Sequence, residues 1–340
     1  MKRIPRKLIS LLLLCALIAL CACGASAEES SADKARGHYT FQPKVCSVYM
    51  EEVFGKTMCE TWFRLVDAVM AGEDTFACPD KDTYNWVMGQ FRDKCFPPLV
   101  DLIDYCYDRP NPVKNGMGSF VYTVPREEAA QRIAAFAQQI EDILNENLED
   151  DYTDFEKALA LYQYIAHNYT YDYSAYEAVL VGYPSWLSSY RVFTTGNGIC
   201  QELSVAYAYL LMQAGVEATN MSGWRSYDHE RHQWTYVRMN SHNYHIDPTY
   251  VIAEPSLRFF MMDDAQREAA DDYHKENYTI TSNYAQDHPH PAYAADDPVC
   301  SPLWSGTFLS LDREAKLLYY TEYDDSGEIV TRTFSYAGMD

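Results

Sequence analysis

A cysteine directly after a glycine-rich turn is the residue in this sequence best suited to nucleophilic chemistry. Cys200 follows Gly196-Asn197-Gly198-Ile199, and glycine allows tight or left-handed backbone that other residues resist. Gly215 lies where a helix commonly ends. Between them, apolar residues recur at helical spacing: Leu203, Ala206, Tyr207, Leu210, Leu211 and Ala214. Cys200 is therefore predicted in the first turn of a mostly buried helix, where free amides and the dipole favour a thiolate. The alternative is a small buried core residue, as most free cysteines are.

A histidine and an aspartate on two predicted strands could supply the partners of this thiol. The segment 232–238 is rich in aromatic and β-branched residues, and 244–247 reads as its return strand, ended by Pro248. If the chain turns near 239–241, His232 and Asp247 fall about opposite each other. Asp247 could then accept the imidazole N–H and fix its tautomer, as a triad requires. A purely structural Asp–His pair is the alternative.

Several motifs in this order make residues 154–250 resemble the transglutaminase-like superfamily of papain-like thiol enzymes. The matching pieces are Gly196-x-Gly198-x-Cys200-Gln201-Glu202, Ala218 to Gly223, His232-x-Trp234-x-x-Val237, Tyr244-x-x-Asp247-Pro248-Thr249-Tyr250 and the upstream Asn168-Tyr169-Thr170-Tyr171-Asp172. The resemblance covers about a third of the chain and leaves the flanks unexplained. Thr235 is a departure, since asparagine often follows His-x-Trp in the family.

The resemblance implies Cys200 as nucleophile, His232 as base and Asp247 as the group that orients the base. It also suggests Tyr171 as a side-chain oxyanion donor beside the Cys200 amide. His229 is a rival base, but the tryptophan at the second position after His232 makes His232 the better choice.

The activity implied is acyl transfer through a thioester, without a metal or cofactor, on a protein or peptide substrate, with cell-wall peptide among the candidates. Hydrolysis, as a protease or amidase, is expected from the resemblance alone. A protein-crosslinking transglutaminase is the alternative within the class. The alternative from another class is a non-catalytic cell-surface binding module on the same fold, although binding alone needs none of Cys200, His232 and Asp247.

The resemblance implies an α+β fold with a papain-like, transglutaminase-like core, in which the nucleophile helix packs on an antiparallel sheet. Thr153 and Glu156 have the spacing of a capping box, and an apolar stripe follows to Tyr169, so a helix is expected beside the nucleophile helix. Residues 38–112 look largely helical, 116–124 reads as a strand and 125–148 as an amphipathic helix. Residues 251–303 look like polar, irregular wrapping, and 306–336 alternate like a small antiparallel β unit.

The N-terminus reads as a bacterial export signal. Basic residues precede an apolar run from Leu8 to Ala22 that is too short for a stable membrane span. Leu20-Cys21-Ala22-Cys23 resembles a lipobox, which predicts lipid modification of Cys23 and a location on the outer face of the cell membrane. The alternative is secretion after cleavage at Ala27. The resulting division is 1–22 signal peptide, 23–37 tether, 38–150 N-terminal α+β extension, 151–255 catalytic core, and 256–340 wrapping segment and β hairpin unit.

The net charge, the histidines and the cysteines indicate which nucleic-acid, metal and disulfide interactions the sequence favours. Without the basic residues of 1–22 the formal charge falls from −22 to −26, from 23 basic and 49 acidic residues, a balance that repels nucleic acid phosphates. The histidines near the hairpin, His242 and His245, and the pair His288 and His290 read as scattered surface residues rather than metal ligands. An exported protein permits disulfides, and their pairing stays open among Cys46, Cys59, Cys78, Cys95, Cys106 and Cys300.

Overall fold

An antiparallel sheet of three strands lies at the centre of the fold, in the order β7 (Glu217–Trp224), β8 (Arg231–Met239) and β9 (His242–Ile246). The computed structural model describes residues 37–106, 111–253, 256–280 and 294–339. The predicted signal peptide, the tether before Gly37, Cys23, His288 and His290 lie outside these residues. Gly37 is hydrogen-bonded to the rest of the fold, because its amide donates to the Leu148 carbonyl at 3.1 Å.

Strands β8 and β9 are joined by the two-residue turn Asn240–Ser241. Both residues have positive φ, 48° and 67°, as expected of the turns that match the twist of paired strands. The register pairs Met239 with His242 and Thr235 with Ile246. The predicted hairpin is therefore present, and its turn is shifted by one residue from the centre that would set His232 opposite Asp247.

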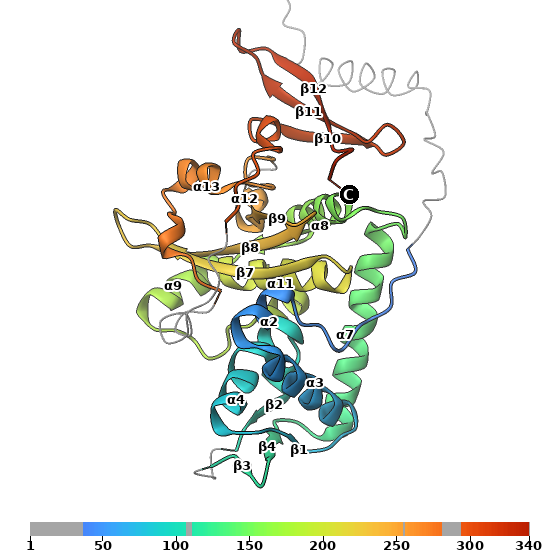
Figure 1. Cartoon of the computed structure of the whole chain (residues 1–340), viewed down its shortest axis with the longest axis vertical. Helices are drawn as coiled ribbons and strands as arrows, with labels where there is room; N and C mark the ends of the chain where they lie inside the picture. The colour runs from blue at the N-terminus through green and yellow to red at the C-terminus, as the bar shows by residue number, and fades with distance from the viewer. Residues whose placement is uncertain (1–36, 107–110, 254–255, 281–293, 340) are drawn as a thin grey trace, which may run out of the picture. The chain divides into compact units, whose positions relative to one another are not determined.

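The predicted nucleophile helix is α11 (Cys200–Gln213), which packs against β7 and β8 (Figure 1). Helix α8 (Asp154–Asn168) packs beside it, and the Tyr207 hydroxyl of α11 donates to the Ala158 carbonyl of α8 at 2.8 Å. The predicted capping box begins α8, with Thr153 and Glu156 each bonded to the other's amide. The predictions that the nucleophile helix packs on an antiparallel sheet and that a second helix lies beside it are confirmed.

The shorter elements of this region lie on either side of α11 in the sequence. They are β5 (Thr170–Tyr171), α9 (Tyr173–Val181), α10 (Ser189–Thr195), β6 (Asn197–Gly198) and α12 (Pro248–Ala253). Strands β5 and β6 pair in parallel, so the loop after α8 runs beside the turn that precedes α11.

The segment before α8 is mainly helical, as predicted. Its helices are α2 (Val48–Phe54), α3 (Lys56–Met70), α4 (Lys81–Trp86), a π-helical turn (Val87–Phe91), α5 (Arg92–Cys95), α6 (Leu99–Leu102) and α7 (Arg126–Asn147). The predicted strand is β4 (Met117–Tyr122), and it pairs with three short strands: β1 (Thr75–Ala77), β2 (Ile103–Tyr105) and β3 (Val113–Lys114). Strands β1 and β2 lie within the range expected to be largely helical, since strands this short leave little alternating pattern.

The segment after α12 is more regular than predicted. Expected to be irregular, it contains α13 (Asp264–Asp271) and two 3₁₀ turns (Lys275–Asn277 and Ser301–Leu303). It also pairs with the central sheet, because His245 and Met262 exchange two backbone hydrogen bonds at 2.9 and 2.8 Å. The C-terminal β unit is confirmed as a three-stranded antiparallel sheet of β10 (Thr307–Asp312), β11 (Leu317–Tyr323) and β12 (Ile329–Ser335).

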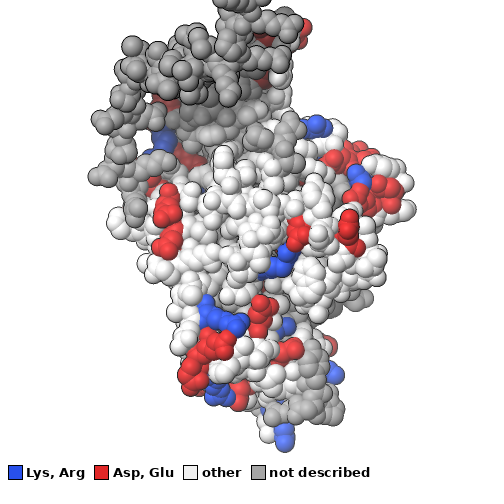
Figure 2. All heavy atoms as spheres, turned by 180° about the vertical axis from the view of Figure 1, so that it is seen from behind, with Lys and Arg blue, Asp and Glu red and all other residues white. Residues whose placement is uncertain are grey.

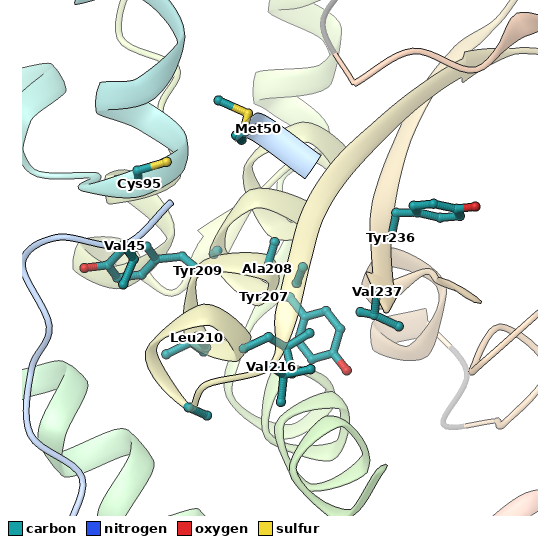
Figure 3. Packing of buried hydrophobic residues seen from close by; sticks show 14 of the residues in the cluster. Val45, Met50, Cys95, Tyr207, Ala208, Tyr209, Leu210, Val216, Tyr236 and Val237 are labelled. Carbon is teal, nitrogen blue, oxygen red and sulfur yellow. The ribbon is translucent and has the colours of Figure 1, made fainter. Parts of the chain in front are cut away.

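One buried apolar cluster extends from Val45 to Met339. Figure 3 shows part of it, in which Val45, Met50 and Cys95 share the cluster with Tyr209 of α11. The mixed helical and sheet composition confirms the predicted α+β class. On the face shown in Figure 2, acidic side chains form several separate groups with Lys and Arg among them, and uncharged surface lies between.

Candidate active site

Cys200 begins α11 after a turn that two glycines make possible. Gly196 ends α10 at φ 73°, in the left-handed region, and Gly198 lies where an added Cβ would come within 2.7 Å of Val192. The Cys200 side chain is part-exposed, whereas most of α11 is buried. The thiol therefore lies at the N-terminal end of a buried helix and within reach of solvent, which is the environment predicted for a nucleophile.

A buried carboxylate fixes the turn before Cys200. Glu202 is fully buried and accepts from the Ile199 amide at 3.0 Å. Arg191 donates to Glu202 at 2.9 and 2.5 Å and to Asp172 at 2.7 Å. The ion pairs thus join the start of α11 to the loop that carries Tyr171. Glu202 belongs to the motif quoted from the sequence, but its spacing alone does not reveal this contact.

His232 and Asp247 meet inside the protein. The Nε2 atom of His232 lies 2.7 Å from Oδ2 of Asp247, which is fully buried. The two residues are about opposite each other but are not directly paired, because the register that pairs Thr235 with Ile246 offsets His232 by two positions from the point facing Asp247. His232 is the diagonal neighbour on the same face, which stays within side-chain reach.

The imidazole also interacts with the Cys200 thiol, which is among the groups that raise the pKa of His232. Since Nε2 faces Asp247, Nδ1 is the ring atom available to sulfur. Burial alone would lower the pKa of His232, but the charges of Asp247 and Cys200 and their hydrogen bonds raise it to about 9. Burial opposes ionisation of Asp247, yet the charges of His232 and Arg267 and the hydrogen bonds it accepts lower the pKa of this carboxyl group. The pair is therefore held as carboxylate and imidazolium at neutral pH.

Aromatic rings enclose the imidazole. The ring centroids of Tyr250, Tyr273 and Trp234 lie 5.4, 5.7 and 6.1 Å from that of His232, and only 8% of His232 is exposed. These rings exclude water from the contact between His232 and Asp247, which strengthens it. They also fix the plane of the imidazole.

Arg267 of α13 supports the Asp247–His232 pair, and this role was not predicted from the sequence. It is fully buried and donates from Nη1 to Oδ2 of Asp247 at 2.9 Å, the same oxygen that His232 contacts. Its guanidinium lies 4.5 Å from the ring centroid of Trp234 and 4.7 Å from that of Tyr273. The segment expected to be irregular wrapping therefore supports the Asp–His pair.

The burial of His245 contradicts a second prediction from the sequence. Interpreted from the sequence as a surface residue, it is fully buried. Its Nδ1 accepts from the indole N–H of Trp234 at 2.8 Å, so Nε2 carries the proton and donates to Asp264 at 3.0 Å. Burial, the largest influence, lowers the pKa of His245. This neutral imidazole therefore holds Trp234, which stacks on His232.

Tyr171 lies beside the nucleophile turn. In the parallel pairing of β5 with β6 it is the partner of Gly198, and the neighbouring Asp172 amide donates to the Gly198 carbonyl at 3.0 Å. Burial and then the charge of Cys200 raise the pKa of Tyr171, so the phenol keeps the proton that an oxyanion donor needs. The structure thus brings Tyr171 together with Cys200, His232 and Asp247.

The other candidates lie apart from this group. His229 is exposed in the turn between β7 and β8, with φ 59°. A cavity of about 190 Å³ lies near the β8–β9 turn, lined in part by Met239, Tyr244 and Met339, and holds none of the four residues above. Among the described residues, no group of three or more His, Cys, Asp or Glu side chains could hold a metal ion.

Comparison with known proteins places this site within a family. A sequence model of the Transglutaminase-like superfamily matches residues 135–248, which contain Cys200, His232 and Asp247. No curated protein matches the chain.

Two solved structures show limited similarity to the chain. A "TGase" has 20% identity and a TM-score of 0.32 over 41% of this chain and 38% of its own. A "Putative Cysteine Protease from Cytophaga hutchinsonii" has 14% identity and a TM-score of 0.28 over 48% of this chain and 44% of its own. The chain thus spans less than half of each structure. By the sequence match, residues 135–248 form a domain of the transglutaminase-like superfamily.

Proposed function

We propose that this protein is a thiol acyl-transfer enzyme that cleaves amide bonds through a Cys200–His232–Asp247 triad. The observation that carries the proposal is the continuous contact from the part-exposed Cys200 through His232 to the buried Asp247, with Nε2 and Oδ2 2.7 Å apart. A purely structural histidine needs only one such partner, whereas a catalytic base needs both the thiol on one side and the carboxylate on the other.

The geometry supports a two-stage reaction. The Cys200 sulfur forms a bond to the substrate carbonyl carbon, and the Cys200 amide and the Tyr171 hydroxyl donate to the oxygen that gains charge. His232 transfers its proton to the leaving nitrogen as the C–N bond breaks, which leaves a thioester. Water then attacks the thioester and gives a proton to His232, and the C–S bond breaks to release the acid and regenerate the Cys200 thiolate beside the imidazolium. An amine in place of water would give transamidation at the same site.

A protein or peptide is the substrate class we propose. Exposed aromatic side chains follow Tyr171 in the sequence, with Tyr173, Tyr183 and Trp186 exposed by 70, 61 and 51%. Tyr183 accepts a hydrogen bond at 2.5 Å from Gln201, the residue after Cys200. Large exposed aromatic groups next to a nucleophile suit an extended chain with apolar side chains.

Export and anchoring are also proposals, and they rest on the sequence of residues 1–27. No helix in the described part of the chain is long and apolar enough to cross a membrane. Radiolabelled palmitate should enter the wild-type chain and not Cys23→Ala. Label in both variants would refute attachment at Cys23 and favour secretion after Ala27.

Alkylation of Cys200 tests the catalytic proposal without knowledge of the substrate. Cys200 is the only cysteine in the tryptic peptide 192–225, so its reaction with iodoacetamide can be followed separately by mass spectrometry. We expect Cys200 to react faster than the other cysteines at neutral pH, and His232→Ala to abolish this advantage. His229→Ala is the matched control, because His229 is exposed outside the triad.

The outcome also separates the alternatives. A Cys200 that reacts no faster than other thiols and is unaffected by His232→Ala would favour a binding module. If Cys200 is activated, incorporation of a fluorescent amine into an acceptor protein would identify transamidation, and release of free acid alone would identify hydrolysis.

A further inference from the structure

Two cysteine sulfurs lie in contact far from Cys200 in the sequence. The Sγ atoms of Cys46 and Cys59 are 2.6 Å apart. Carbon atoms pack at roughly 3.5–4.0 Å, and sulfur is larger, so two unbonded thiols would repel each other at this distance. A disulfide brings its sulfur atoms to about 2.05 Å, so the arrangement suits a covalent pair better than two thiols.

The surrounding contacts hold both cysteines in this position. The indole N–H of Trp62, in α3 with Cys59, donates to the carbonyl of Val45 at 3.1 Å. Ser47 caps α2 and Cys46 precedes it. The two sulfurs therefore come from the N-terminal arm (residues 37–47) and from helix α3, which an adjacent hydrogen bond already joins, and a bond between them requires no rearrangement of the fold.

We propose that Cys46 and Cys59 form a disulfide in the mature protein. This modification site is independent of the proposed activity at Cys200. It joins the N-terminal arm to helix α3. The Gln213 side chain already holds this arm, because it accepts from the Gln42 amide at 2.9 Å and donates to the Gln42 carbonyl at 2.7 Å. In the sequence, this arm follows the segment predicted to tether the protein.

Thiol–disulfide exchange with an external disulfide would form the bond. Cys46 is part-exposed and Cys59 is 3% exposed, so Cys46 is the thiolate that attacks the external disulfide and releases one thiol. Cys59 then attacks the sulfur of Cys46 and releases the second thiol. The two protons lost by the cysteines end on the two released thiols, and the external disulfide gains the two electrons.

Cys95 is the competing partner. It is fully buried at the end of α5, and its thiol has a hydrogen bond with Cys46. Of the three pairs that three thiols allow, the interactions of Cys46 support two, 46–59 and 46–95. The contact of 2.6 Å favours the first.

Peptide mapping distinguishes these pairings directly. Trypsin places Cys46 in peptide 45–56, Cys59 in 57–64 and Cys95 in 95–114. The full-length chain, produced in an oxidising compartment or treated with oxidised glutathione, is alkylated, digested without reductant and analysed by mass spectrometry. We expect peptides 45–56 and 57–64 to be linked, and to separate only after reduction.

Variants make the assignment specific. Cys59→Ala should remove the link, whereas Cys95→Ala should retain it. Cys78→Ala is the matched control, since the buried Cys78 sulfur donates to the Asp80 carbonyl at 3.3 Å. A link between 45–56 and 95–114, or full alkylation of Cys46 and Cys59 after treatment with oxidised glutathione, would overturn the proposal. Neither result bears on the reactivity of Cys200, so the two proposals can fail separately.

Discussion

Replacement of Arg267 by methionine should destabilise the protein strongly, because it removes one partner of a buried ion pair. Arg267 and Asp247 are both fully buried, with Nη1 2.9 Å from Oδ2. Removal of one partner from such a pair costs about 3–5 kcal/mol, and because Asp247 keeps its contact with His232 we expect a cost near the lower end of this range. Loss of the guanidinium from above the rings of Trp234 and Tyr273 acts in the same direction.

Equilibrium unfolding in urea measures this cost, and a double variant isolates its cause. Asp247→Asn alone should also be destabilising, because it leaves Arg267 buried and charged. Asp247→Asn/Arg267→Met contains neither the buried carboxylate nor the buried guanidinium of this pair, so the loss should be smaller than the sum of the single losses by about 1–3 kcal/mol.

Arg238→Met is the matched control for Arg267→Met. Arg238 also contacts a carboxylate, Glu52 at 3.0 Å, and an aromatic ring, Tyr49 at 4.7 Å, but its side chain is 27% exposed. Exposed pairs contribute about 0–1 kcal/mol. If Arg267→Met costs no more than Arg238→Met, or if the double variant shows purely additive losses, the reasoning about Arg267 is refuted.

Three further predictions concern pH, the oxyanion and the thiol pair. The raised pKa of His232 contributes stability that is complete below its ordinary value of 6.5 and is lost as pH rises through about 9. Urea unfolding across this window should show the decline in the wild type and not in His232→Ala; parallel curves would contradict it. Tyr171→Phe should slow acylation of Cys200 by an activated ester by roughly 10²–10³-fold if the hydroxyl is an oxyanion donor, with alkylation by iodoacetamide unchanged. An unaltered acylation rate would remove Tyr171 from the site. Cys46→Ala should lower the stability of the oxidised protein by about 3 kcal/mol, the value for a loop of about 15 residues, and equal stability in non-reducing urea titrations would contradict the disulfide.

The parts of the site that depend on local sequence could be predicted. The turn and helix around Cys200 and the capping box of α8 are set by residues within a few positions of one another. The predicted contact between His232 and Asp247 was also correct, although the register does not pair them directly. A register difference of two residues leaves His232 and Asp247 on the same face of the sheet. A difference of one residue would have placed their side chains on opposite faces.

The supporting residues could not be predicted because their burial depends on distant segments. Arg267 lies in a polar stretch whose composition gives no sign of the core, and it is buried because the chain around Met262 pairs with His245 of β9. His245 was interpreted as exposed because histidine is polar. Its burial requires the partners Trp234 and Asp264, and only the fold reveals that they are present.

The carboxylate that begins α8 has a consequence for biosynthesis. Glu156 is fully buried, and besides closing the capping box it accepts from the Tyr336 hydroxyl at 2.8 Å. Lys316 of the C-terminal segment lies 3.4 Å from the same carboxylate. Since synthesis runs from the N-terminus, a nascent chain cannot complete the surroundings of Glu156 until the segment from Lys316 to Tyr336 has been made. The helix beside Cys200 therefore reaches its native environment only after more than 150 further residues have followed it, and the growing polypeptide stays incompletely folded until then.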